Sequence, residues 1–367
     1  MSLEDGPDFF VWSLNLPEAA RRFAAAHRIP VYHVEDGFIR SAVLQAGRTP
    51  PLSLIVDSRT PYFDSRQPSD LEVILSTYDF EADPALMDRA ASAIEMLRRG
   101  GIGKYNSGEL AGRPIYPAKT RRRVLVLGQV DGDASIRYGA ARPITNDALV
   151  RLAAADNPDA EIIYKPHPDV LAGVRSSRAR LDELARIATI LRVRSPLAQA
   201  LETIDHVYSM TSLGGFEALL RGIPVTVTGL PFYAGWGLTD DRHDNLRRTR
   251  RLTLTQVFAG AYLLYPLYFE PETGARTSFE DVIRTLYRPL APAFQSEESR
   301  VSRRKALGLF GWRRSFLPLV SSLVGRVGTE EDARYFEAFP ADFFQERPEA
   351  ALRRIGALLF PPGRLGP

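Results

Sequence analysis

The sequence predicts an α/β protein with two Rossmann-like domains that face a cleft, followed by a C-terminal helical tail. Short apolar runs alternate with amphipathic helical patterns from Phe9 onward, the order typical of a parallel sheet wrapped by helices. The basic run KTRRR then separates a first series of such units from a second, as an interdomain linker does. We therefore expect domains at residues 1–118, 119–290 and 291–367.

Composition limits the class of protein. The chain has 367 residues, 45% of them hydrophobic, and a formal net charge of +3. This length suits about two domains with substantial cores, and so small a charge does not indicate a nucleic-acid partner. The lack of cysteine excludes a disulfide scaffold, a thiol nucleophile and a zinc–cysteine site. No signal-peptide pattern and no run of roughly 18 apolar residues is present, so we expect a cytoplasmic protein.

The first domain begins with the strand FFVWS, the helix PEAARRFAAAHRI and the strand PVYHVE. This second strand ends in Glu35 and Asp36, and Arg40 follows closely. Ligands gather at the carboxyl ends of strands in parallel α/β sheets, so these three residues are candidates for a binding site. An ordinary turn is the alternative. A strand in PPLSLIVDS, a helix capped by Ser69 and a helix that stops at Gly100 and Gly101 complete the domain.

The second domain opens with RRVLVLGQV, a continuous apolar strand of the kind that is buried on both faces of a parallel sheet. Polar side chains crowd its carboxyl end, where exposure to a cleft is expected: Gln129, Asp131, Asp133 and Ser135.

A later strand, EIIYK, ends at Lys165 and is followed by His167 between two prolines. A lone histidine is more often structural than functional. One that prolines hold at a strand end, beside a lysine, suits a contact to phosphate or carboxylate.

The stretch HVYSMTSLGGFEALLRGIPVTVT predicts a strand, a turn, a helix and a second strand. Thr211, Ser212 and Gly214 lie where the helix begins, so hydroxyl groups and free backbone N–H groups are expected to suit a phosphate there. Glu217, one turn into the helix, either accepts hydrogen bonds from ribose hydroxyls or reaches back to Gly214 in a capping box.

The segment PFYAGWGLTDDR is too irregular for a helix and too apolar for a solvated loop. We expect it to line the cleft, with Tyr233 and Trp236 as substrate contacts. Two more helices are expected after it, an aromatic-rich one in LTLTQVFAGAYLLYPLYFEP and another in TSFEDVIRTLYRPLAP.

Asp131 and Asp133 allow two kinds of chemistry. In the first, both carboxylates share a magnesium ion with a nucleotide diphosphate. In the second, Asp133 attacks an anomeric carbon and forms a covalent intermediate, which a second attack resolves with net retention. Only the second gives Gln129 and Ser135 a function, as hydrogen-bond partners that keep Asp133 ionised and aimed. We therefore predict a site without a metal.

The motifs of the chain resemble those of the capsule polysaccharide biosynthesis family of retaining β-Kdo glycosyltransferases, from about Val31 to Tyr268. They are EDGFIRS, PPLSLIVD, PSDLE, KYN, GQVDGDASI, YKPHPDV, MTSLGGFEALLRG and PFYAGWGLTDDR. Within the family, the chain is most similar to the C-terminal catalytic module of the two-module members.

The resemblance implies a GT-B-like fold and transfer of Kdo, an eight-carbon acidic sugar, from CMP-Kdo to a Kdo-terminated glycolipid of capsule linker synthesis, without a cofactor. It implies Asp133 as the nucleophile, His167 and Ser212 as contacts to CMP, and Glu217 as the ribose contact. We choose Glu35 as the base that deprotonates the acceptor, because it ends a strand of the opposite domain. Gly132 stands where an acidic residue is expected, and the lack of a second module leaves linkage and acceptor open.

Residues 299–367 lie outside the resemblance. Their basic and aromatic side chains suit an anionic membrane surface, which would make the protein peripheral on the cytoplasmic face of the inner membrane. A helix packed on its own domain, with arginine side chains extended to water, is the alternative.

Two other functions stay open. One is a GT-B-like transferase or epimerase that uses another nucleotide sugar. The other is a non-catalytic module of the capsule assembly and export complex.

Overall fold

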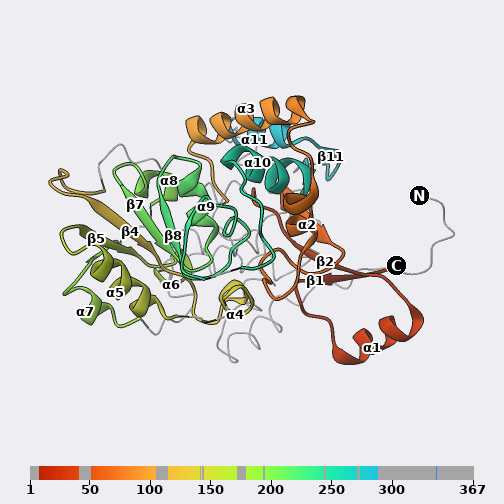
Figure 1. The fold of residues 1–367 in the computed structure, drawn as a ribbon, viewed down its shortest axis with the longest axis horizontal. Coiled ribbons are helices and arrows are strands. Elements are labelled where there is room, and N and C mark those ends of the chain that lie inside the picture. Colours follow the sequence, from red (N-terminus) through yellow and green to blue (C-terminus); the bar gives the residue numbers. More distant parts are fainter. Residues whose placement is uncertain are drawn as a thin grey trace, which may run out of the picture. The chain divides into compact units, whose positions relative to one another are not determined.

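The computed structural model describes residues 8–40, 51–104 and 115–287, with short gaps at 141, 143, 172–178, 193–194, 244 and 271–272, and residue 336. The chain divides into two compact units, residues 1–287 and 288–367. Every helix and strand in Figure 1 belongs to the first unit. The first unit thus includes nearly all of both predicted Rossmann-like domains, while the predicted tail lies outside the described residues, apart from Phe336. None of the described helices is long and apolar enough to span a bilayer.

The first sheet is mixed rather than parallel. Its strand order is β1-β2-β3-β10-β11, and only β1 and β2 run parallel. The strands are β1 (Phe9–Trp12), β2 (Val31–Asp36), β3 (Ser53–Asp57), β10 (Leu267–Phe269) and β11 (Arg276–Thr277).

The last two strands of this sheet come from residues that the sequence predicts to be in the second domain. A single helix was expected through LTLTQVFAGAYLLYPLYFEP. The structure has α10 (Leu254–Phe258), a π-helical turn η1 (Ala259–Leu264) and then β10. Pro266 separates η1 from β10, and proline cannot continue a helix because it lacks the N–H and clashes with the preceding turn. The chain therefore returns to the first sheet at this point.

Of the three helices beside the first sheet, the second begins and the third ends where their capping residues predict. They are α1 (Glu18–His27), α2 (Asp70–Thr77) and α3 (Pro84–Gly100). Ser69 caps α2 by accepting a hydrogen bond from the Glu72 N–H at 3.1 Å, and Gly101 closes α3 with a φ of 59°. In Figure 1, α3 lies beside α10 and α11 (Phe279–Tyr287).

The second sheet is wholly parallel, as predicted, with the order β6-β5-β4-β7-β8-β9. Its strands are β4 (Arg123–Leu127), β5 (Glu161–Lys165), β6 (Thr189–Ile190), β7 (His206–Ser209), β8 (Val225–Val227) and β9 (Asp240–Asp241). All five residues of β4 are buried. The strand order reverses between β4 and β7, and ligands of such sheets bind outside the carboxyl ends at this switch point.

Six helices, most of them short, accompany the second sheet in the described part of the chain. They are α4 (Ala134–Gly139), α5 (Asn146–Asp156), α6 (Pro168–Leu171), α7 (Leu181–Leu184), α8 (Leu197–Ala200) and α9 (Leu213–Leu219). One apolar core includes residues of both sheets. Phe38, next to β2, packs against Phe232 with 4.7 Å between the ring centroids, and Phe216 of α9 stacks on Tyr262 of η1 with 5.8 Å between theirs. A second core joins α5 to the other face of β4 and β5.

Candidate active site

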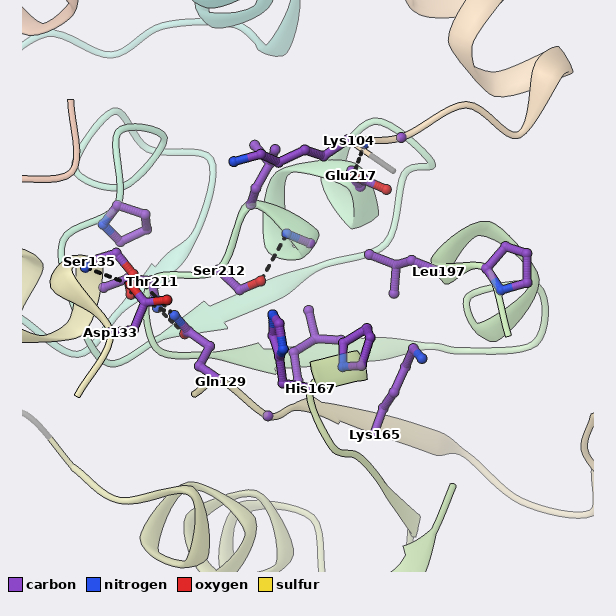
Figure 2. A pocket seen from close by; sticks show the side chains of 18 of the residues that line it. Lys104, Gln129, Asp133, Ser135, Lys165, His167, Leu197, Thr211, Ser212 and Glu217 are labelled. Carbon is purple, nitrogen blue, oxygen red and sulfur yellow. Dashed lines mark hydrogen bonds between the residues drawn. The ribbon is translucent and has the colours of Figure 1, made fainter. Parts of the chain in front are cut away.

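A pocket of about 540 Å³ lies at the switch point of the second sheet and is also lined by residues of the first sheet. This volume suits a ligand of nucleotide-sugar size. Figure 2 shows the side chains around it. Ten of the predicted site residues line this pocket: Glu35, Gln129, Asp133, Ser135, Lys165, His167, Thr211, Ser212, Gly214 and Glu217.

Gln129 joins the carboxyl ends of β4 and β7. Its Oε1 accepts a hydrogen bond from the Thr211 N–H at 2.9 Å, and its Nε2 donates to Thr211 Oγ1 at 3.0 Å. The Ser135 hydroxyl lies 3.0 Å from the same threonine oxygen. Gln129 therefore fixes Thr211 and Ser135, whereas we had predicted that it would contact Asp133 directly.

Asp133 sits at the N-cap of α4. Its Oδ1 accepts a hydrogen bond from the Ser135 backbone N–H at 2.8 Å, so the main chain of Ser135, rather than its hydroxyl, orients the carboxylate. Gly132, with a φ of 81°, makes the turn that leads into this position, and a residue with a side chain would be strained there.

Asp131 points elsewhere. Its Oδ1 accepts a hydrogen bond from Asn146 Nδ2 at 3.2 Å, and it does not line the pocket. Of the two residues of the D-x-D pattern, only Asp133 therefore lines the pocket. Within the described residues, no group of three or more His, Cys, Asp or Glu side chains is arranged to hold a metal ion.

Glu35 enters the pocket from the first sheet. Burial raises the pKa of its carboxyl group, and the negative charges of Asp36 and Asp133 raise it further, while a hydrogen bond from Ser13 and the positive charge of Lys104 lower it. Asp133 is therefore close enough for its charge to act on Glu35. The pocket therefore holds Glu35, from a strand of the first sheet, and Asp133, from the N-cap of a helix beside the second sheet.

Lys165 is the last residue of β5, and His167 follows two residues later. The Lys165 ammonium donates to the Ser195 carbonyl at 3.3 Å, and burial lowers its pKa to about 8. His167 Nδ1 accepts a hydrogen bond from the Asp169 backbone N–H at 3.2 Å, which assigns the proton of the neutral ring to Nε2. Both residues can therefore offer an N–H group to an anion.

Ser212, not Glu217, caps α9. The Ser212 hydroxyl accepts a hydrogen bond from the Gly214 N–H at 3.1 Å. The capping box that we considered for Glu217 is not formed, because Glu217 Oε1 instead accepts a hydrogen bond from the Lys104 backbone N–H at 3.0 Å. Gly214 fits closely, since a Cβ there would lie 2.9 Å from the side chains of Leu127 and Leu197.

Glu217 is only 7% exposed, and burial raises its pKa, although the Lys104 N–H and the charges of Arg221 and Lys104 act in the opposite direction. Gly103 makes this approach possible, because a Cβ at that position would lie 2.4 Å from Glu217 Oε2. Lys104 itself lines the pocket and is a residue that we did not predict. The only signal for it was its place at the start of the KYN motif.

Four predicted substrate contacts lie away from the pocket lining. Asp36 and Arg40 form an almost buried ion pair, with 2.9 Å between Oδ2 and Nε. Tyr233 and Trp236 are buried in the core, where Tyr233 donates to the Ser212 carbonyl at 2.6 Å and Trp236 to the Phe232 carbonyl at 2.8 Å. These aromatic side chains support the pocket wall from behind, while Pro231 and Phe232 of the same segment line it.

Comparisons with known proteins agree on one family. The sequence model described as "Capsule polysaccharide biosynthesis protein" matches residues 15–270. The lipopolysaccharide-processing protein LpsZ of Rhizobium meliloti is 45% identical over 278 residues, which cover 76% of this chain and 63% of LpsZ. The capsule polysaccharide modification protein LipA of Neisseria meningitidis serogroup A is 42% identical over 288 residues, which cover 78% of this chain and 40% of LipA.

Two solved structures from Thermosulfurimonas dismutans are also similar. The KpsC β-Kdo 2,4 transferase superposes with a TM-score of 0.70 and 40% identity, covering 76% of this chain and 86% of that one. The KpsC β-Kdo 2,7 transferase superposes with a TM-score of 0.59 and 37% identity, covering 76% of this chain and 83% of that one. The chain therefore spans most of each solved transferase chain but less than two thirds of each curated relative named above.

Proposed function

The chain belongs to the capsule polysaccharide biosynthesis protein family, and we propose that it is a retaining β-Kdo glycosyltransferase with CMP-Kdo as its donor substrate. The observation that supports this most directly is the pocket lining, which includes Asp133 together with Lys165, His167 and Ser212, the residues to which we assign phosphate binding. Similarity to the two KpsC Kdo transferases supports the choice of sugar.

In the proposed donor complex, the phosphate of CMP contacts Lys165, His167 and the Ser212 hydroxyl. Burial has lowered the pKa of Lys165 to about 8, and a bound phosphate dianion or monoanion would favour its charged form. Glu217, at the pocket wall, can accept hydrogen bonds from the ribose hydroxyls through the oxygen that Lys104 does not use. A CMP-sugar has a single phosphate, so these groups can stabilise the leaving group without a magnesium ion and without any other cofactor.

The proposed reaction has two displacements. A carboxylate oxygen of Asp133 forms a bond to the anomeric carbon of Kdo while the bond to the phosphate oxygen breaks, and CMP leaves with the electron pair. The acceptor hydroxyl then attacks the same carbon, and the Asp133 carboxylate departs. Each displacement inverts the anomeric centre, so the overall result is retention.

Glu35 is the proposed base for the second displacement, because it faces Asp133 across the pocket. It would take the proton of the acceptor hydroxyl as the new glycosidic bond forms. Burial is the main cause of the raised pKa of Glu35, and the negative charge of Asp133 is a smaller one. Esterification of Asp133 would remove this smaller contribution, so the first step favours the ionised form of Glu35 that the second step needs.

We further propose a GT-B-like division of labour, with the donor held by the second sheet and the acceptor, a Kdo-terminated glycolipid, approaching from the first. The 2,4 transferase matches better than the 2,7 transferase in both TM-score and identity, so we expect a β-(2→4) linkage. Action on the cytoplasmic side of the membrane, with residues 299–367 as a peripheral contact and the capsule assembly and export complex as a partner, completes the proposal.

The test is incubation of the purified chain with CMP-Kdo and a Kdo-terminated acceptor, followed by mass spectrometry and NMR analysis of the linkage. We expect one added Kdo with retained β configuration, and full activity in the presence of a chelator. No transfer from CMP-Kdo together with transfer from another nucleotide sugar, or an absolute requirement for magnesium, would contradict the proposal. The Asp131→Asn variant is a matched control, because its carboxylate bonds Asn146 outside the pocket.

A further inference from the structure

Positive charge lines the pocket at two separate places. Lys165 ends β5 and His167 follows it, and Lys104 is the one further Lys, Arg or His among the described residues of the lining. Figure 2 shows Lys104 beside Glu217 on one side of the pocket, with Lys165 and His167 on the other. In the proposed donor complex, Lys165 and His167 bind the phosphate. Lys104 has no function in that complex.

The main chain of Lys104 is held from both sides. Its N–H donates to Glu217 Oε1 at 3.0 Å, and its carbonyl accepts a hydrogen bond from the Arg40 N–H at 3.1 Å. The first contact reaches α9 beside the second sheet, and the second contact reaches the end of β2. The main chain of Lys104 is therefore held in place where the side chain lines the pocket. A residue that recognises a particular ligand group needs such a fixed position.

Negative charge surrounds the place where the sugar would react. The positive charge of Lys104 lowers the pKa of both Glu35 and Glu217, so its ammonium group acts on this side of the pocket, where the charge of Asp133 also reaches Glu35. Kdo is a 2-keto sugar acid, and its carboxylate is bonded directly to the anomeric carbon. Binding of this sugar against Asp133 would bring a further negative charge to carboxylates that already repel one another.

We propose that Lys104 binds the carboxylate of the transferred sugar and thereby selects an acidic sugar as donor. This inference rests on the proposed function, because it assigns a subsite within the same pocket. Lys165, His167 and Ser212 then bind the nucleotide phosphate, and Lys104 offsets the charge of the sugar acid beside Asp133. A neutral nucleotide sugar would leave the ammonium group of Lys104 opposite an uncharged ring and would bind less well.

The test compares ligands with and without the sugar carboxylate. In Lys104→Met, which keeps the length of the side chain and removes its charge, we expect the KM for CMP-Kdo to rise about 10-fold or more, as the loss of a charge-assisted hydrogen bond predicts. The affinity of Lys104→Met for CMP, which lacks the Kdo group, should stay within about 2-fold of the wild-type value in calorimetry. Free Kdo should inhibit the wild-type enzyme more strongly than its C1 amide, and Lys104→Met should lose this preference. Lys104→Arg should recover part of it.

The matched control is Lys119→Met, which removes a lysine that pairs with Asp205 at 2.7 Å and does not line the pocket. Equal losses of CMP and CMP-Kdo binding in Lys104→Met would show a structural role and overturn the subsite. An unchanged KM and an unchanged preference for Kdo over its amide would overturn it too. In both cases an active wild-type enzyme leaves the proposed function intact, whereas a wild-type protein that neither binds nor uses CMP-Kdo contradicts the proposed function and this subsite together.

Discussion

Glu35 and Asp133 face the same pocket from two different sheets. Glu35 lies in β2 of the first sheet, and Asp133 caps α4 beside the second. Burial is the main reason that the pKa of Glu35 is raised, and the negative charge of Asp133 adds to it. The proposed double displacement would use Asp133 as the nucleophile and Glu35 as the base that deprotonates the acceptor.

The first prediction concerns pH. Glu35 acts as a base only when ionised, and its pKa lies above the ordinary 4.5, so transfer should fall as the pH drops through a value higher than that of an exposed glutamate. Glu35→Gln should remove this acidic limb from the profile of turnover against pH and lower turnover by about 100-fold or more. Formation of the covalent intermediate should persist, because the first displacement does not use this base. An unchanged acidic limb in the variant would assign the pH dependence to another group.

The second prediction concerns the nucleotide. His167→Ala and Ser212→Ala should each weaken CMP binding by roughly 1.5 to 3 kcal/mol in calorimetry, the range for a lost charge-assisted hydrogen bond. Ser212→Ala also removes the cap of α9, so its melting temperature has to be measured alongside. His27→Ala, which changes an exposed histidine of α1, is the control. If CMP binds both pocket variants as tightly as the wild type, these residues do not belong to the nucleotide site.

Local patterns predicted much of this fold. The caps at Ser69 and Gly101, the buried strand β4 and the parallel second sheet all follow from periodicity and turn residues. The site was predictable for a related reason. Residues that follow parallel strands meet at one edge, and this rule brings Gln129, His167 and Ser212 into a single pocket.

Long-range pairing and side-chain direction were not predictable in this way. The short run that forms β10 pairs with β3, more than 200 residues earlier in the chain, and β11 pairs with β10. No local pattern encodes the partner of β10. Tyr233 and Trp236 lie in an irregular segment without a period, so the sequence could not show that they face the core instead of the pocket, where we predicted them. Lys104 was missed because its position depends on Glu217.

The third prediction concerns stability. Glu72 of α2 forms ion pairs with Arg248 at 3.0 Å and with Arg247 at 2.7 Å, and Arg248 is only 6% exposed. Arg248 also donates to the carbonyls of Pro231 and Ala234, which holds the pocket-lining segment against the first sheet. Glu72→Ala leaves this guanidinium group buried without its carboxylate and should cost about 3 to 5 kcal/mol of unfolding free energy.

Urea denaturation of the full chain measures this cost. Glu95→Ala serves as the control, because its ion pairs with Arg98 and Arg99 are exposed and should contribute less than about 1 kcal/mol. Equal urea midpoints of unfolding for Glu72→Ala and Glu95→Ala would show that the ion pairs of Glu72 with Arg247 and Arg248 do not stabilise the fold more than an exposed pair does.

The fourth prediction concerns the membrane. Residues 299–367 lie outside the described part of the chain apart from Phe336, so the prediction rests on their sequence. Replacing the basic residues of the segment SRRKALGLFGWRRSF by glutamine in the full chain should reduce flotation with anionic liposomes, since each basic residue near such a surface contributes about 1 kcal/mol. Binding should also weaken with added salt. Failure of the wild-type chain to float with anionic liposomes at low salt would reject this role.

The last prediction concerns the nucleophile. Asp133→Asn keeps the volume of the side chain and an oxygen that can accept the hydrogen bond of the Ser135 N–H, so α4 stays capped while the attacking carboxylate is lost. Transfer should fall by more than about 1000-fold, whereas CMP should bind as in the wild type. Mass spectrometry of the wild-type enzyme with CMP-Kdo should show a Kdo adduct on the peptide that contains Asp133. Asp131→Asn, whose carboxylate bonds Asn146, should keep both activity and adduct. Near-normal turnover by Asp133→Asn, or an adduct that maps to Asp131, would overturn the assignment of Asp133 as the nucleophile.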